Sequence, residues 1–138
     1  MLSIVEKVIF LQDVNIFSET TTENLGYIAS ITEEKFFEPK QNIFKENQYA
    51  DSMYIIVSGK VLLTRGEKEI TRVGKNEAIG TWALLDDELT IATATAIENT
   101  HALQIGREDF FDLLSDHIEI TQSIFKSLVM RVRKLLPN

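Results

Sequence analysis

The residues able to do metal or nucleophilic chemistry in this sequence are few, and their spacing fits no familiar site. The chain has no cysteine, which excludes thiolate nucleophiles, thiolate metal ligands and disulfides. His101 and His117 are the only histidines, and neither has a second histidine at the spacing of a metal-binding pair. The acidic run Asp86-Asp87-Glu88 lacks the alternating spacing of a calcium loop. We therefore expect no metal centre.

Phosphate-binding and acyl-transfer motifs are also missing. Gly74-Lys75 has neither the upstream glycine nor the following Ser or Thr of a P-loop. No serine lies in a Gly-x-Ser-x-Gly motif, and no nucleophile stands with a candidate base. The residues give no reason to expect an enzyme.

Composition and charge limit the class of protein further. A chain of 138 residues with 44% hydrophobic and 25% charged residues is expected to be one domain with its own core. The net charge of -7 disfavours nucleic acid as a partner. No apolar run reaches the ~18 residues of a membrane span, and Glu6 and Lys7 interrupt the apolar N-terminus, so we expect no membrane insertion and no signal peptide. Together with the missing cysteines, these features indicate a cytoplasmic protein.

The elements that would position a site follow from periodicity. Residues 1–31 read as helical, with Thr21 as the N-cap of a second helix. Residues 32–106 read as short strands: about eight are expected, one of them beginning at Phe36 and one with Ala92, Ala94 and Ala96 on a single face. The predicted fold class is α+β, mainly β: an antiparallel β-roll or jelly roll flanked by N-terminal helices and a long C-terminal helix.

Residues 107–138 return to the helical period. A short helix is followed by a longer one from about Ile118 to Leu136, which Pro137 is expected to end. Basic side chains crowd its C-terminal half, where they favour the helix dipole. Its apolar spacing resembles a heptad seam, which would either hold a homodimer or pack against the chain's own roll. The seam consists of Ile118, Thr121, Phe125, Leu128, Val132 and Leu135.

The order helices, strand roll, long helix resembles the cyclic-nucleotide-binding domains, and local sequence agrees with this over nearly the whole chain. The residues that carry the resemblance are Phe17-Ser18, Ile43-Phe44-Lys45-Glu46-Asn47-Gln48, Asp51-Ser52-Met53-Tyr54-Ile55-Ile56-Val57-Ser58-Gly59-Lys60-Val61 and Arg107-Glu108-Asp109-Phe110-Phe111. Three turn glycines of the family are replaced here by Lys40, Asn47 and Asn76. Asparagine tolerates a left-handed backbone, so only the turn at Lys40 is expected to differ.

The resemblance implies a ligand site in a segment that runs glycine, glutamate, short helix, loop, arginine. Its residues here are Gly80, Thr81, Trp82, Ala83, Thr90, Ile91, Ala92 and Thr93. Thr81 stands at the glutamate position and Thr90 at the arginine position. A cyclic phosphate binds through helix-start amides and a guanidinium, and the glutamate accepts from the ribose hydroxyl. Charged hydrogen bonds contribute roughly 1.5–3 kcal/mol each, so losing both predicts affinity weaker by about two orders of magnitude.

Several functions remain open at this point. One is a regulatory or sensory domain with a degenerate pocket, in which Trp82 either fills space near the ligand or packs ordinarily, and which signals through the C-terminal helix to a host or partner protein. Another is a working cAMP or cGMP module that uses backbone amides, Thr81 and Thr90; no other cofactor is implied. The third is a ligand-free dimerisation or interaction domain. The family's transcription factors carry a helix-turn-helix after the long helix, but this sequence stops at Asn138. The opening helix and Phe17-Ser18 resemble domains of this family at the end of larger regulated proteins, which suggests an excised piece, although Met1 also permits a complete small protein.

Overall fold

A computed structural model describes residues 1–136. The chain begins with three short helical segments: α1 (Ile4–Gln12), the 3-10 turn η1 (Asn15–Phe17) and α2 (Thr22–Ser30). Local side chains cap both α-helices. The Ser3 hydroxyl accepts a hydrogen bond from the Glu6 amide (3.1 Å) and the Glu6 carboxylate accepts one from the Ser3 amide (3.0 Å), which is a capping box. Thr21 accepts from the Asn24 amide at 3.3 Å, so the predicted N-cap of α2 is confirmed.

The middle of the chain is the predicted roll of eight antiparallel strands. They are β1 (Glu33–Phe37), β2 (Asn42–Phe44), β3 (Ser52–Ser58), β4 (Val61–Arg65), β5 (Lys68–Val73), β6 (Ala78–Ile79), β7 (Thr93–Ala96) and β8 (Thr100–Gly106). They form two four-stranded sheets, in the orders β1-β8-β3-β6 and β2-β7-β4-β5. Strand β1 begins at Glu33 rather than at Phe36, and the two-residue strand β6 is too short for periodicity to reveal.

The alternating alanines are placed as predicted. Ala92, Ala94 and Ala96 are buried, and β7 lies between β2 and β4 in its sheet. Their small side chains let the two sheets approach each other at the centre of the roll, where Ala94 packs in a cluster with Ile56 and Val61.

All three replaced turn glycines adopt the left-handed backbone. The φ angles are 74° at Lys40, 60° at Asn47 and 72° at Asn76. The expectation that the turn at Lys40 differs was wrong. The turn is held because the Lys40 amide donates to the Ala96 carbonyl at 2.7 Å, which fixes the strained residue against the sheet.

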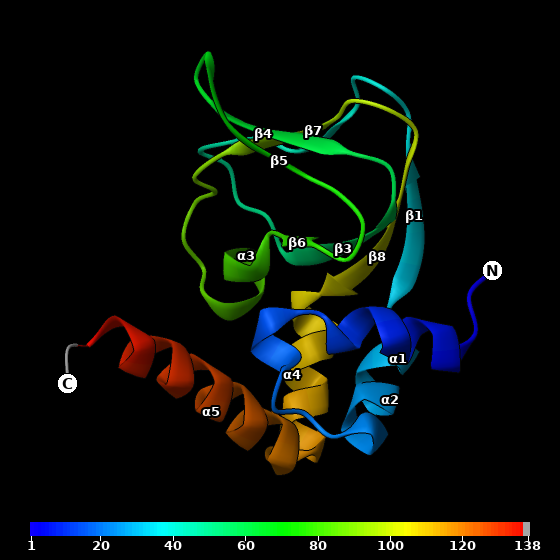
Figure 1. Ribbon diagram of the computed structural model, residues 1–138, viewed down its shortest axis with the longest axis vertical. Coiled ribbons are helices and arrows are strands. Elements are labelled where there is room, and N and C mark those ends of the chain that lie inside the picture. Colours follow the sequence, from blue (N-terminus) through cyan, green and yellow to red (C-terminus); the bar gives the residue numbers. More distant parts are fainter. Residues whose placement is uncertain (137–138) are drawn as a thin grey trace.

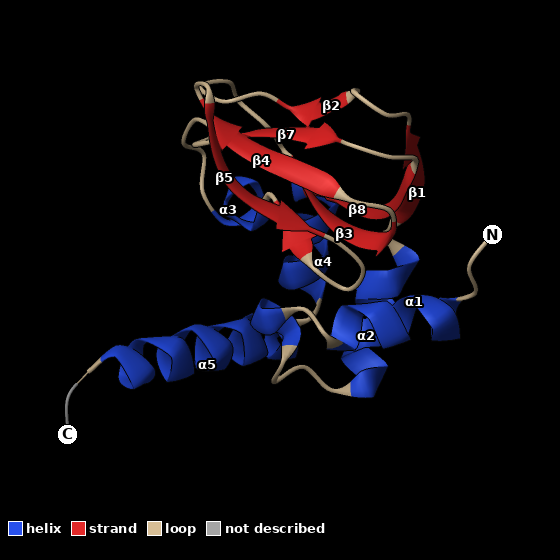
Figure 2. Ribbon diagram, turned by 45° about the horizontal axis from the view of Figure 1, so that its top comes forward, coloured by secondary structure: helices blue, strands red, loops and turns tan. Residues whose placement is uncertain are grey.

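Two helices end the chain, α4 (Arg107–Asp116) and α5 (Ile118–Leu135), and they lie with α1 and α2 below the roll (Figures 1 and 2). The larger core cluster joins these helices to the sheet β1-β8-β3-β6. The predicted stop at Pro137 lies outside the described residues. Within residues 1–136, no helix is both long enough and apolar enough to span a bilayer.

Helix α5 packs on η1 and α4 through a narrow stripe and then extends away from the roll (Figure 1). Ile120, Ile124 and Ser127 are buried on this stripe. Hydroxyl pairs fix the contact: Ser123 with Thr20 at 2.8 Å and Ser127 with Ser18 at 3.2 Å.

The predicted seam lies on a different face of α5. Ile118, Phe125, Val132 and Leu135 are exposed by 61%, 64%, 55% and 83%, and Thr121 and Leu128 are half-buried. The alternative that the seam packs against the chain's own roll is therefore wrong for its four exposed members. The reason is that the interior stripe takes the neighbouring positions 120, 124 and 127 instead.

Candidate functional site

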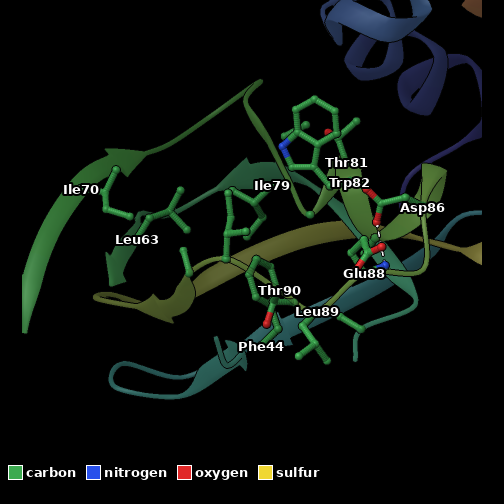
Figure 3. Close-up of a pocket in the computed structure, with 16 residues that line it drawn as sticks. Phe44, Leu63, Ile70, Ile79, Thr81, Trp82, Asp86, Glu88, Leu89 and Thr90 are labelled. Atoms are coloured by element: carbon green, nitrogen blue, oxygen red, sulfur yellow. Dashed lines mark hydrogen bonds between the residues drawn. The ribbon is translucent and has the colours of Figure 1, made fainter. Parts of the chain in front are cut away.

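A cavity of about 620 Å³ opens in the roll beside a short helix, α3 (Thr81–Leu85). Figure 3 shows its walls, which come from α3, the loop after it, and strands β2, β4, β5 and β6. Of the predicted site residues, all except Thr93 line it. The Thr93 hydroxyl instead accepts from the Glu46 amide at 3.0 Å, so it holds β7 to the turn after β2.

Gly80 makes the sharp turn that places α3 at the cavity. Its φ is 76°, and a Cβ at this position would lie 2.8 Å from the Ser52 carbonyl oxygen. Any other residue would therefore push β6 away from β3. Ala83 and Leu84 are buried and anchor α3, which leaves Thr81 and Trp82 at the cavity.

Thr81 lines the cavity, and its hydroxyl is free of hydrogen bonds within the described residues. Among residues 1–136, no side chain or backbone group forms a hydrogen bond with its Oγ1, and the residue is half-buried. It is therefore a neutral donor and acceptor at the position where the family resemblance implies a glutamate.

Thr90 is used differently, because its hydrogen bonds all run to the turn after β2. Its hydroxyl donates to the Lys45 carbonyl and accepts from the Gln48 amide at 3.2 Å. Its backbone amide donates to the Gln48 carbonyl at 2.9 Å, and its carbonyl accepts from the Asn47 amide at 2.8 Å. The side chain that stands at the arginine position thus ties two loops together, and its only donor hydrogen is not available to a ligand.

The charged residues that line the cavity are acidic. Within the described part of the chain these are Asp86 and Glu88, and no Lys or Arg lines it. Asp86 accepts from the Glu88 amide at 3.0 Å, which orders the loop (Figure 3). Arg65 lies near the loop, where its Nε donates to the Ile91 carbonyl at 3.1 Å. Both charged side chains that line the cavity would repel an anion.

Trp82 does not fill the cavity. Its side chain is 61% exposed, and the cavity beside it stays open. The same residue also lines a second cavity of about 390 Å³, which reaches η1, Leu128 and Arg131 of α5. Trp82 and Thr81 therefore stand between the larger cavity and the C-terminal helix.

The apolar wall of the cavity was not predictable from the sequence pattern; it is contributed by Phe44, Leu63, Ile70, Ile79 and Leu89. Val61, Leu62 and Leu63 are all apolar, so alternation could not tell which of them points inward. Ile70 reaches the cavity through an irregularity: Leu63 pairs with Thr71 and Thr64 with Glu69, which leaves Ile70 as an extra residue in β5. Such a bulge has no signature in a single sequence.

The described residues form no arrangement typical of a metal site, and the titratable side chains His101 and Tyr54 lie outside the cavity. No group of three or more His, Asp or Glu side chains among them could hold a metal ion. His101 is bonded to Glu34 at 2.9 Å and stacked on Phe36, on the outer side of β8 and β1. Burial raises the pKa of Tyr54, whose hydroxyl accepts a hydrogen bond from Gln104 in the sheet, away from the cavity.

Comparison with known sequences and structures agrees with this geometry. The family model for the cyclic nucleotide-binding domain matches residues 34–117. A cGMP-dependent protein kinase from Eimeria tenella is 37% identical over 99 residues, 72% of this chain and 10% of the kinase. The cyclic AMP receptor protein of Thermus thermophilus is 26% identical over 124 residues, 86% of this chain and 57% of that protein. The chain thus spans about a tenth of such kinases, over their regulatory domain and not their catalytic part.

Solved structures share the fold. The N-terminal domain of a transcriptional regulator from Streptomyces coelicolor superposes with a TM-score of 0.86 at 24% identity, over 91% of this chain and 94% of that one. The regulatory domain of Toxoplasma gondii PKA, crystallised with cAMP, gives 0.77 at 18% identity, over 95% and 50%. The family match covers the roll and the cavity that Gly80, Thr81 and Trp82 line. This chain belongs to the cyclic nucleotide-binding domain family.

Proposed function

We propose that this chain is a regulatory domain with a weakened grip on cyclic nucleotides, which passes its state through α5 to a host or partner protein. The observation that carries the proposal is the charge of the cavity wall: it has two carboxylates and no guanidinium or ammonium group among the described residues. An anionic ligand would lose its charge-assisted hydrogen bonds there and meet repulsion instead.

Relatives support a regulatory role. They include cGMP-dependent protein kinases, a cAMP-dependent protein kinase regulatory subunit and a cyclic AMP receptor protein, and in each the matched part is only a fraction of the whole. By this likeness we infer that the domain controls a protein to which it is joined or bound. The chain has no cysteine and so no disulfide that would require an oxidising compartment. We therefore propose that the domain works in the cytoplasm.

The route to α5 runs through the second cavity. Thr81 and Trp82 line it from α3, and Leu128 and Arg131 line it from α5. A shift of α3 on ligand binding would change this packing directly. Ligand binding can change the equilibrium between two positions of α5 only by the difference in the ligand's binding free energy to the two states.

Calorimetric titration of the chain with cAMP and cGMP tests the weakened grip. We expect no saturable heat below about millimolar ligand, because two charged contacts are replaced by hydroxyls. The double variant Thr81→Glu, Thr90→Arg restores the residue types that the family resemblance implies, and we expect it to bind at least about tenfold more tightly than the wild type. Micromolar binding by the unaltered chain would overturn the proposal and favour a working nucleotide module.

A second candidate function is a dimerisation or docking domain that acts through the seam on α5. The observation in its favour is the exposure of Ile118, Phe125, Val132 and Leu135 on one face of the helix. An apolar stripe at heptad spacing is typical of a helix that meets another helix.

A further inference from the structure

The mouth of the larger cavity is surrounded by apolar side chains that water still reaches. Ile70, Trp82, Leu89 and Ile91 line the cavity and are exposed by 49%, 61%, 43% and 60%. Figure 3 shows Ile70 and Leu63 on one side of the opening and Leu89 with Phe44 on another. A ligand seated in the cavity would cover these surfaces, and that burial would favour binding.

Polar groups that could bond such a ligand are few and uncharged on the α3 side. The Thr81 hydroxyl is one donor and acceptor at the cavity. The Thr90 hydroxyl is already bonded to the backbone of Lys45 and Gln48. The site therefore offers hydrogen bonds to a hydroxyl or carbonyl but no countercharge to a phosphate.

The carboxylates select against negative charge. Asp86 is half-buried at the cavity and Glu88 lies beside it in the same loop. The negative charges of these two carboxylates raise the energy of an anion in the cavity. They have no such effect on an uncharged molecule. The loop that carries them is held at its far end by the hydrogen bonds of Thr90, and Asp86 accepts from the Glu88 amide at 3.0 Å.

We propose that the cavity takes an uncharged ligand of the nucleoside type, with a flat ring and a polar edge, in place of a cyclic nucleotide. A cavity of about 620 Å³ is within the range that holds such molecules. The inference rests on the proposed loss of the anion grip and adds what replaces it. The apolar wall holds the flat part of the ligand, and Thr81 bonds its polar edge.

Adenosine and cAMP are a matched pair for the test, because they share the base and ribose and differ in the cyclic phosphate. We expect saturable adenosine binding in calorimetry or ligand-observed NMR, at least about tenfold tighter than cAMP. Thr81→Val removes the hydroxyl at nearly constant shape and should weaken adenosine by about fivefold. Trp82→Ala should weaken it as well, since part of the apolar wall is lost.

The acidic loop has its own variant and control. In Asp86→Asn, Glu88→Gln we expect cAMP affinity to rise by about five- to tenfold while adenosine affinity stays within about twofold. Asp87→Asn removes a carboxylate of the same loop that does not line the cavity, and neither affinity should change beyond about twofold. This comparison separates the charge inside the cavity from the net charge of the surface.

The outcomes also separate the two proposals. Absence of binding by both adenosine and cAMP would overturn the uncharged-ligand inference and leave the weakened grip standing. Binding of cAMP that is tighter than that of adenosine but still near millimolar would overturn the uncharged-ligand inference alone, and micromolar cAMP binding tighter than that of adenosine would overturn both proposals. If Arg65→Ala then abolished that cAMP binding, the guanidinium beside Ile91 would be the anion clamp.

Discussion

Thr81 and Thr90 stand at the two positions where the family resemblance implies charge, but their hydroxyls have different surroundings. Thr81 faces the cavity without a partner among the described residues, whereas Thr90 joins its loop to the turn at 45–48. The two threonines therefore differ in what their hydroxyls can do. The hydroxyl of Thr81 remains without a hydrogen-bond partner among the described residues, and that of Thr90 is part of the fold.

This difference predicts that Thr90 contributes to stability. Thr90→Val keeps the side-chain shape but removes both hydroxyl bonds, leaving the Gln48 amide and the Lys45 carbonyl to water. We expect a loss of about 1–2 kcal/mol of unfolding free energy, measured by urea denaturation. Thr71→Val is the matched control, since the exposed Thr71 hydroxyl contacts only the adjacent Arg72 carbonyl at 3.5 Å. Equal effects of the two substitutions would contradict the structural role of Thr90.

Sequence patterns predicted residues whose conformation is set locally and missed those set by distant contacts. Asn47 and Asn76 were predictable as left-handed positions because their side chains favour that backbone. Lys40 was not, since its conformation depends on a hydrogen bond to Ala96. The role of Thr90 was hidden for the same reason: its partners are 42 and 45 positions away.

At the scale of the element, hydrophobic periodicity predicted the helix α5 but not which of its faces is buried. The helix and its apolar spacing were predicted, and the helix is present at Ile118–Leu135. Its faces could not be assigned, because Ile120 and Ile124 are as apolar as Phe125 and Val132. Small polar residues determine which face of α5 packs inward. Ser123 and Ser127 let α5 approach η1 closely, and their hydroxyls pair with those of Thr20 and Ser18.

The exposed seam gives a prediction for oligomeric state. If the seam joins two copies, Phe125→Glu should convert a dimer to a monomer in sizing chromatography with light scattering, since it places charge in an apolar contact. Met130→Glu is the control, because Met130 is also exposed, by 42%, but lies on another face of the helix. A wild type that is monomeric at about 100 μM would contradict the dimer and leave a protein partner for the seam.

At the scale of the whole molecule, one carboxylate adds a polar link to the apolar core that joins the N-terminal helices to the roll. Glu34 of β1 accepts from the Leu2 amide at 3.0 Å, just before α1, and is bonded to His101 of β8 at 2.9 Å. The ring of His101 stacks on Phe36 with centroids 4.3 Å apart. A single side chain thus links the start of the chain to two strands that are otherwise far from it in sequence.

This link predicts how stability depends on pH. The hydrogen bond from the Leu2 amide, and then that from His101, lowers the pKa of Glu34 below its ordinary value. The contribution of Glu34 is therefore complete above the carboxyl's unfolded pKa, about 4.3, and is lost as the pH falls through its lower value in the folded protein. Glu34→Gln can keep both bonds without titrating, so its melting temperature should fall less steeply than the wild type's between about pH 5 and pH 3. Glu38→Gln, at an exposed position just after β1, should keep the wild-type slope. Parallel slopes for Glu34→Gln and wild type would show that the carboxylate does not fasten α1 to the roll, because its protonation would then cost the folded state nothing.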